Sequence, residues 1–134
     1  MSSTPRIIVV SGVVIRDRRG RLLTVRKRGT SRFMLPGGKP ETSESAVAAA
    51  SRECGEEVGL VIPAYRLRCW GEFRSAAANE SGCDIEATVF GYDGVVDELT
   101  PSAEIAEIRW LDLEDRPLPE DLAPLLIDHV IPAL

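Results

Sequence analysis

Residues 38–60 constrain this chain more than any other segment, because they predict a helix with an unusual charge pattern. Glu53, Glu56 and Glu57 stand at i, i+3 and i+4, and such positions are neighbours on one face of a helix. Three carboxylates on one patch form a strongly negative site. Hard cations such as Mg²⁺ or Mn²⁺ bind oxygen ligands of that kind, so the segment predicts a divalent-metal site.

The alternative is that these glutamates form an ordinary solvated helix face, which is the commoner role of acidic runs. Gly59 is typical of a residue that ends a helix in the left-handed conformation, so Glu56 and Glu57 fall in the last turn. Negative charge there opposes the helix dipole by roughly 0.3–1 kcal/mol per exposed charge, and like charges one turn apart add a smaller penalty. Several unfavourable charges within one helical turn favour a functional role for these glutamates.

A glycine pair stands just before this helix. Residues 33–35 predict a short apolar strand that Pro36 ends, since proline cannot donate to a sheet. Gly37 and Gly38 let the backbone bend and approach a ligand closely. Alone, the pair would be an ordinary turn, but ahead of the glutamate helix it can supply a backbone carbonyl to the same metal. Lys39 adds a positive charge suited to a phosphate oxygen.

The segment resembles the Nudix box of the Nudix hydrolases. That pattern is Gly, five residues, Glu, seven residues, Arg-Glu, an apolar residue, any residue, Glu-Glu, any residue, Gly and an apolar residue. Every position from Gly38 to Leu60 fits, with Cys54 in an apolar slot where Leu or Ile is commoner. Ser43 departs from the glycine that many relatives carry before the first box glutamate, Glu44. The departure bears on the loop conformation rather than on the chemistry.

The resemblance implies roles for individual residues. Glu53, Glu56 and Glu57 are expected to bind Mg²⁺ or Mn²⁺, directly or through water, together with the carbonyl of Gly37. The reaction it implies is attack of a metal-activated water on phosphorus of a nucleoside diphosphate that is linked to another group. The other expected participants are Arg52 and Glu44, which hold the helix and orient the ligands, and Lys39 and Gly38, which contact the substrate.

A glutamate must take the proton of the attacking water. Glu53 is our first choice for this base. Residues 104–111 are similar to a later segment of the family that leads into a strand with a tryptophan, and a glutamate near this place completes the metal site in some relatives. Glu104 is therefore the second candidate for the base and a candidate ligand, in preference to Glu107, and its alternative role is that of a surface carboxylate on an edge strand.

Length and composition limit the remaining choices. A chain of 134 residues is predicted to form one domain, residues 1–134. Its net charge of −5 argues against DNA or RNA binding through a basic surface. The longest apolar runs are too short to cross a bilayer, and residues 1–5 carry no targeting signal, so we expect a cytoplasmic protein. Three cysteines without metal-ligand spacing are expected to be reduced and mostly buried.

The order of apolar segments predicts an α/β sandwich with a mixed sheet between helices, which is also the fold that the resemblance implies. The first strand is expected to be buried on both faces, and the helix is expected to bury Val47, Ala50, Cys54 and Val58 beside an exposed glutamate face. The expected strands are residues 6–17, 21–26, 33–35, 65–73, 83–92 and 104–111, and the expected helices are residues 45–58 and 121–131.

The sequence thus predicts a Nudix hydrolase that needs Mg²⁺ or Mn²⁺ and cleaves a diphosphate linkage in a small nucleotide or nucleotide derivative. Nucleoside triphosphates lead the candidate substrates, because the sequence contains no added recognition module. Nucleotide sugars, dinucleotide polyphosphates and capped RNA ends stay open, as do the identity of the base and the oligomeric state, a homodimer included. The rival from another class is a nucleotide-sensing domain without catalysis, although such domains usually lose box carboxylates. A diphosphate isomerase of the same fold is disfavoured, since it carries extra active-site residues.

Overall fold

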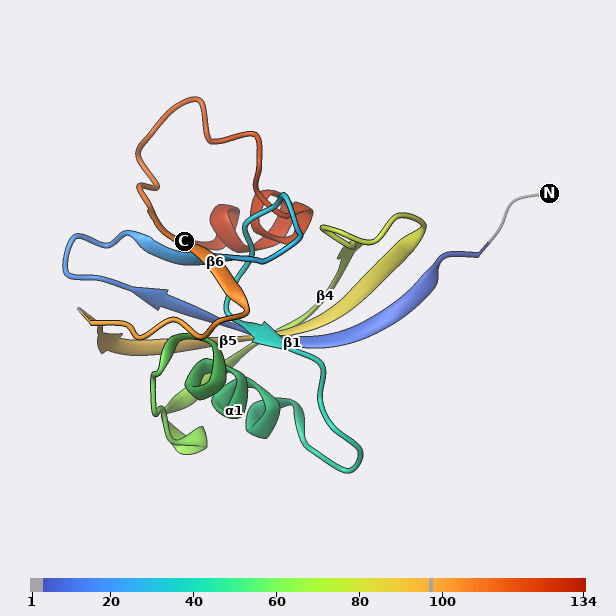
Figure 1. Cartoon of the computed structure of the whole chain (residues 1–134), viewed down its shortest axis with the longest axis horizontal. Helices are drawn as coiled ribbons and strands as arrows, with labels where there is room; N and C mark the ends of the chain where they lie inside the picture. Colours follow the sequence, from blue (N-terminus) through green and yellow to red (C-terminus); the bar gives the residue numbers. More distant parts are fainter. Residues whose placement is uncertain (1–3, 97) are drawn as a thin grey trace.

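A mixed sheet forms the middle layer of the molecule in the computed structural model, which describes residues 4–96 and 98–134 (Figure 1). Residues 1–3 of the segment searched for a targeting signal lie outside the described residues. The strands are β1 (Arg6–Arg16), β2 (Leu22–Lys27), β3 (Gly37–Gly38), β4 (Leu67–Ala76), β5 (Cys83–Val95) and β6 (Ile105–Leu111).

The sheet of the described residues has six strands in the order β4-β5-β1-β2-β6, with β3 paired to β1. β1 and β5 run parallel, and the other pairs are antiparallel. Helix α1 (Ala46–Val58) lies on one side of the sheet, and the last helical segment lies on the other (Figure 1). That segment contains η2 (Leu126–Val130) and η3 (Ile131–Ala133), and a short turn, η1 (Ala64–Arg66), precedes β4. The predicted α/β sandwich is confirmed.

Helix α1 begins and ends as its sequence predicts. The Ser45 hydroxyl accepts a hydrogen bond from the Ala48 N–H at 3.2 Å, which caps the first turn. Gly59 adopts φ 74°, and its N–H donates to the carbonyl of Gly55. A Cβ at this glycine would lie 2.9 Å from the side chain of Thr100. The stop is therefore set by backbone conformation and by the segment that packs against it.

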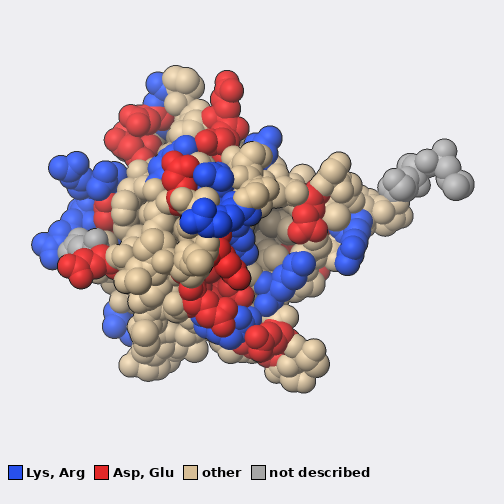
Figure 2. Space-filling view, viewed as in Figure 1, with Lys and Arg blue, Asp and Glu red and all other residues tan. Residues whose placement is uncertain are grey.

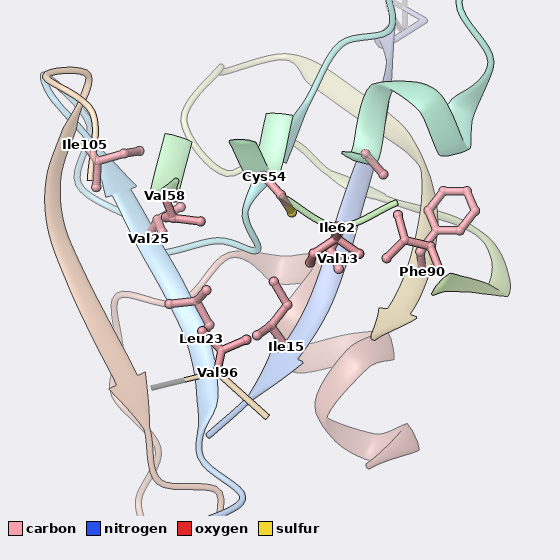
Figure 3. Packing of buried hydrophobic residues seen from close by; sticks show 12 residues of the cluster. Val13, Ile15, Leu23, Val25, Cys54, Val58, Ile62, Phe90, Val96 and Ile105 are labelled. Carbon is pink, nitrogen blue, oxygen red and sulfur yellow. The ribbon is translucent and has the colours of Figure 1, made fainter. Parts of the chain in front are cut away.

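Two hydrophobic clusters hold the three layers together. The first lies between α1 and the sheet, where Cys54 and Val58 of the helix face Val13, Leu23 and Val25 (Figure 3). The second lies between the sheet and the last helical segment, with Phe33, Leu122 and Leu126 among its buried members.

The prediction that Val47 is buried like its neighbours was wrong, since it is only half-buried at the border of the first cluster. The prediction that β1 is buried on both faces holds only for its second half. Ile7 and Val9 are 40% and 53% exposed. The cluster beneath α1 contains Val13 and Ile15 of this strand but not these earlier side chains, so α1 leaves the start of β1 uncovered.

Two predicted elements lie elsewhere. Residues 33–35 were predicted as a strand, but Phe33 and Met34 form only isolated bridges, and the short strand is the glycine pair itself. The helix predicted over residues 121–131 starts later, because Leu122 forms a bridge with Phe33, and the Ala123 N–H donates to the Phe33 carbonyl. The chain around Leu122 is therefore extended where the apolar pattern predicted a helix.

The structure also tests the expectations about cysteine burial, membrane-spanning helices and a basic surface. Cys54, Cys69 and Cys83 are free thiols, but only Cys54 is buried, so the prediction of mostly buried cysteines was wrong. No helix within residues 4–96 and 98–134 has the length and apolar character needed to cross a membrane. Acidic and basic side chains are interspersed on the face drawn in Figure 2, without a continuous basic surface among the described residues there.

We expect Val58→Ala to lower the free energy of unfolding by about 2 kcal/mol, because it leaves a void in the cluster beneath α1. Val58 is 0% exposed. Val61→Ala is the matched control, since that side chain is 93% exposed and its loss should change stability by less than about 0.5 kcal/mol. Urea unfolding of both variants measures the difference, and equal stabilities would contradict the packing described here.

Candidate active site

The glycine pair of β3 brings backbone against both β1 and helix α1. Gly37 pairs with Gly12, and Gly38 pairs with Ser11. A Cβ at Gly37 would lie 1.9 Å from the Ser11 carbonyl oxygen, and one at Gly38 would lie 2.7 Å from the carboxylate carbon of Glu53. At Gly37 the neighbouring atoms are backbone, so this close approach requires glycine there, whereas a side chain at Gly38 would displace the carboxylate of Glu53.

Glu57 is the most buried charged side chain of the site, with 2% exposure. Its Oε1 accepts a hydrogen bond from the Gly37 N–H at 2.9 Å. Its Oε2 accepts no hydrogen bond but lies 3.3 Å from the Lys27 ammonium. Burial raises the pKa of Glu57 to about 7, although the Gly37 hydrogen bond and the Lys27 charge oppose the rise. The prediction that Glu57 lies on an exposed helix face was therefore wrong.

Arg52 ties the acidic side chains together. Its Nε and Nη2 each donate to the Glu44 carboxylate at 2.9 Å, in a bidentate pair. Its Nη1 lies 3.0 Å from Glu53 and 3.2 Å from Glu56, and its Nη2 also donates to the Lys39 carbonyl at 3.2 Å. The guanidinium thus holds the pKa of Glu44 at about 2. Arg52 and Glu44 are thus in direct contact, and Arg52 links Glu44 to Glu53 and Glu56.

The carboxylate of Glu53 lies close to both Arg52 and Gly38. Burial raises the pKa of its carboxyl group above the ordinary value, and the hydrogen bond and charge of Arg52 work against that rise. The side chain is 15% exposed, next to the backbone of Gly38. A carboxylate that is partly shielded from water and close to a backbone turn suits a proton acceptor.

Lys39 and Glu104 lie at the rim of the site. The Lys39 side chain is exposed, and only its backbone carbonyl bonds to Arg52. Glu104 is also exposed, and its carbonyl accepts a hydrogen bond from the Arg28 N–H at 2.8 Å. Among the described residues, no hydrogen bond or ion pair joins the Glu104 side chain to the glutamates of α1. Its segment does reach the helix, because the Ser102 N–H donates to the Glu57 carbonyl.

The sequence predicted three converging carboxylates without a balancing cation, and the structure corrects this expectation. Arg52 pairs with Glu53 and Glu56, and Lys27 pairs with Glu57. Within the described part of the chain, no three acidic, histidine or cysteine side chains are gathered as a ready ligand set. Lys27 was missed because nothing in the sequence around it indicates that its strand ends beside α1.

The donors that are present nevertheless fit a hard divalent cation. They are carboxylate oxygens on one helix and backbone carbonyls beside it, and such cations prefer oxygen ligands. The buried Oε2 of Glu57 accepts no hydrogen bond and has the Lys27 ammonium 3.3 Å away, so it keeps lone pairs that a cation can bind.

Comparisons with known proteins point to one family. A family model described as NUDIX domain matches residues 6–133. A MutT-like protein from Streptomyces ambofaciens is 37% identical over 60 residues, which cover 45% of this chain and only 38% of that protein. The crystal structure of a MutT protein from Methanosarcina mazei Go1 aligns with a TM-score of 0.70 and 26% identity over 90% of each chain. A MutT NUDIX hydrolase from Burkholderia pseudomallei aligns with a TM-score of 0.69 and 25% identity, over 85% of this chain and 89% of that one.

The raised pKa of Glu57 predicts how the stability of the metal-free protein depends on pH. In the unfolded chain the carboxyl group ionises near its ordinary pKa of 4.5, whereas in the folded protein it keeps its proton up to about pH 7. The free energy of unfolding should therefore fall by up to about 3 kcal/mol as the pH rises from about 4.5 to about 7.

Chemical unfolding in the presence of EDTA, across this pH range, measures the effect. Glu57→Gln cannot ionise, so the difference in stability between the variant and the wild type isolates this one group. A difference that does not change between pH 4.5 and pH 7 would contradict the burial of Glu57.

Proposed function

Since this chain belongs to the Nudix hydrolase family, we propose that it uses Mg²⁺ or Mn²⁺ to cleave a diphosphate linkage in a nucleotide or nucleotide derivative. The observation that carries the proposal is the placement of two α1 carboxylates against β3. Glu53 lies beside Gly38, and Glu57 binds the Gly37 N–H. The missing side chains of the two glycines make this close placement possible.

We assign the metal to Glu53, Glu56 and Glu57, with the carbonyl of Gly37 and with Glu104 as a further candidate. When bound there, a divalent cation lowers the pKa of a water and offsets negative charge on the phosphate. The oxygen donors of the site support this assignment, as does the buried Glu57 oxygen that lacks a hydrogen-bond donor. That the cation is Mg²⁺ or Mn²⁺ is inferred from the family.

The remaining residues act through charge and position. Glu53 is the proposed base, because it is partly buried and its pKa is raised by that burial. Arg52 fixes the carboxylate of Glu53 and is itself held by Glu44. Lys39, whose side chain is exposed at the end of β3, is proposed to bind a phosphate oxygen of the substrate, and the backbone of Gly38 is proposed to line the same place.

Nucleoside triphosphates are the proposed substrates. Lys27 contacts Glu57, and Lys39 directly follows the glycine pair; basic side chains near the carboxylates offset the charge of a polyphosphate. Nucleotide sugars, dinucleotide polyphosphates and capped RNA ends are the alternatives within the same chemistry. We also propose that residues 1–134 form one domain and that the protein acts in the cytoplasm. A homodimer is compatible with this function but not required by it.

A hydrolysis screen tests the proposal. With Mg²⁺ present, at least one nucleotide of a panel of triphosphates, sugar nucleotides and dinucleotide polyphosphates should be cleaved. Glu53→Gln and Glu57→Gln should each lower its turnover at least about 100-fold, because each removes a carboxylate from the reacting centre. Nucleotide binding without cleavage of any compound would favour the sensing domain, and normal turnover in both variants would remove α1 from the chemistry.

A comparison with Glu107 tests the role of Glu104. Glu107 is an exposed glutamate of β6 that pairs with Arg26. If Glu104 is a ligand or the base, Glu104→Gln should lower turnover far more than Glu107→Gln. The acidic limb of the pH–rate profile should shift as well, since that limb reports the essential base. Equal and near-wild-type rates in both variants would leave Glu53 as the base.

A further inference from the structure

Lys27 contacts the site although it lies outside the glutamate helix and the glycine pair. It is the last residue of β2, and the pairing of β2 with β6 shifts register between Arg26 and Lys27. Such irregularities re-aim the side chain that they carry. Here the Lys27 ammonium comes to lie 3.3 Å from Oε2 of Glu57, although its stem is 35% exposed.

The two oxygens of Glu57 have different surroundings. Oε1 is committed to the Gly37 N–H at 2.9 Å. Oε2 is buried and accepts no hydrogen bond, so its only charge partner among the described residues is Lys27. Oε2 therefore offers the lone pairs that no hydrogen bond occupies, and a cation that coordinates Oε2 is repelled by the Lys27 ammonium where water is excluded.

We propose that Lys27 is the internal counter-ion of the metal centre, and that its ammonium leaves Oε2 of Glu57 when a divalent cation binds. The inference rests on the function proposed above. It assigns Lys27 a positioning role, because its ammonium is the charge partner that orients Oε2 of Glu57 before the cation arrives.

The two basic residues of the site differ in how firmly they are held. Arg52 makes a bidentate pair with Glu44 and further bonds to Glu53, Glu56 and the chain at Lys39. Among the described residues, the Lys27 ammonium makes one ion pair, with Glu57, at the end of a flexible side chain. A planar guanidinium with several bonds is fixed, whereas an ammonium on four methylenes can move at little cost. Lys27 is therefore the group that can give way.

If Lys27 and Mg²⁺ compete for Oε2 of Glu57, removing the lysine should raise the affinity for Mg²⁺. Lys27→Met removes the competing ammonium, so the full-length variant should bind Mg²⁺ about tenfold more tightly than the wild type, as measured by calorimetry with the metal alone. Its melting temperature without metal should fall, because Glu57 loses its partner, and Mg²⁺ should raise that temperature more than it does for the wild type. Lys27→Gln repeats the test if the methionine variant does not fold.

Two variants provide controls. Arg26→Met removes a neighbouring positive charge that pairs with exposed Glu107, so it should leave the affinity for Mg²⁺ within about twofold of wild type, given the small energies of exposed pairs. Lys27→Arg keeps the charge and should bind Mg²⁺ no more tightly than the wild type.

Each outcome has one meaning. Weaker or unchanged Mg²⁺ binding in Lys27→Met and Lys27→Gln would overturn the inference, because a merely structural lysine would support the site rather than compete for it. Tighter binding in Arg26→Met as well would also overturn it, by attributing the effect to net charge. If the wild-type protein binds no Mg²⁺ at all, the proposed function itself fails, and that result is distinguishable from the other two.

Discussion

The hydrogen bond between the Gly37 N–H and the buried carboxylate of Glu57 joins the glycine pair of β3 to the glutamates of α1. Gly37 belongs to a two-residue strand on the edge of β1, and Glu57 belongs to the last turn of α1. Because the bond is buried, breaking it would leave both a peptide N–H and a charged oxygen without water. The loop of residues 39–45 is thereby tied at both ends, so the carboxylates of α1 stay in register with the glycine backbone.

The end of α1 illustrates how a local conflict is resolved by distant residues. Acidic side chains in the last turn are unfavourable beside the negative end of the helix dipole. Arg52, one turn earlier, forms ion pairs with Glu56 and Glu53. Lys27, at the end of β2, forms an ion pair with Glu57. The segment that holds Thr100 and Ser102 then donates two N–H groups to the open carbonyls of Val58 and Glu57. The helix end is thus stabilised by partners that only the folded chain provides.

Much of this arrangement could be predicted from the sequence, because it depends on short-range rules. The start of the helix near Ser45 and its end at Gly59 follow from local rules, whereas the supporting roles of Arg52 and Glu44 were implied by the family resemblance. The burial of Glu57 and the contact with Lys27 could not be predicted, since they depend on how β2 and β3 are placed against α1. Neither could the extended chain at Leu122, whose apolar neighbours fit a helix equally well until Phe33 pairs with it.

The parallel pairing of β1 with β5 has a consequence for the order in which the protein can form. Arg6 of β1 pairs with Cys83 of β5, and Leu22 of β2 pairs with Leu111 of β6, so one edge of β1 and one edge of β2 lack their partners until later residues are synthesised. Helix α1 is complete in the chain before either partner strand exists, and an isolated helix of its length is marginal in water. Contacts this distant in sequence slow folding. The edge of β1 that pairs with β5 therefore stays open until β5 is synthesised, and the sheet is complete only after β6 has joined β2.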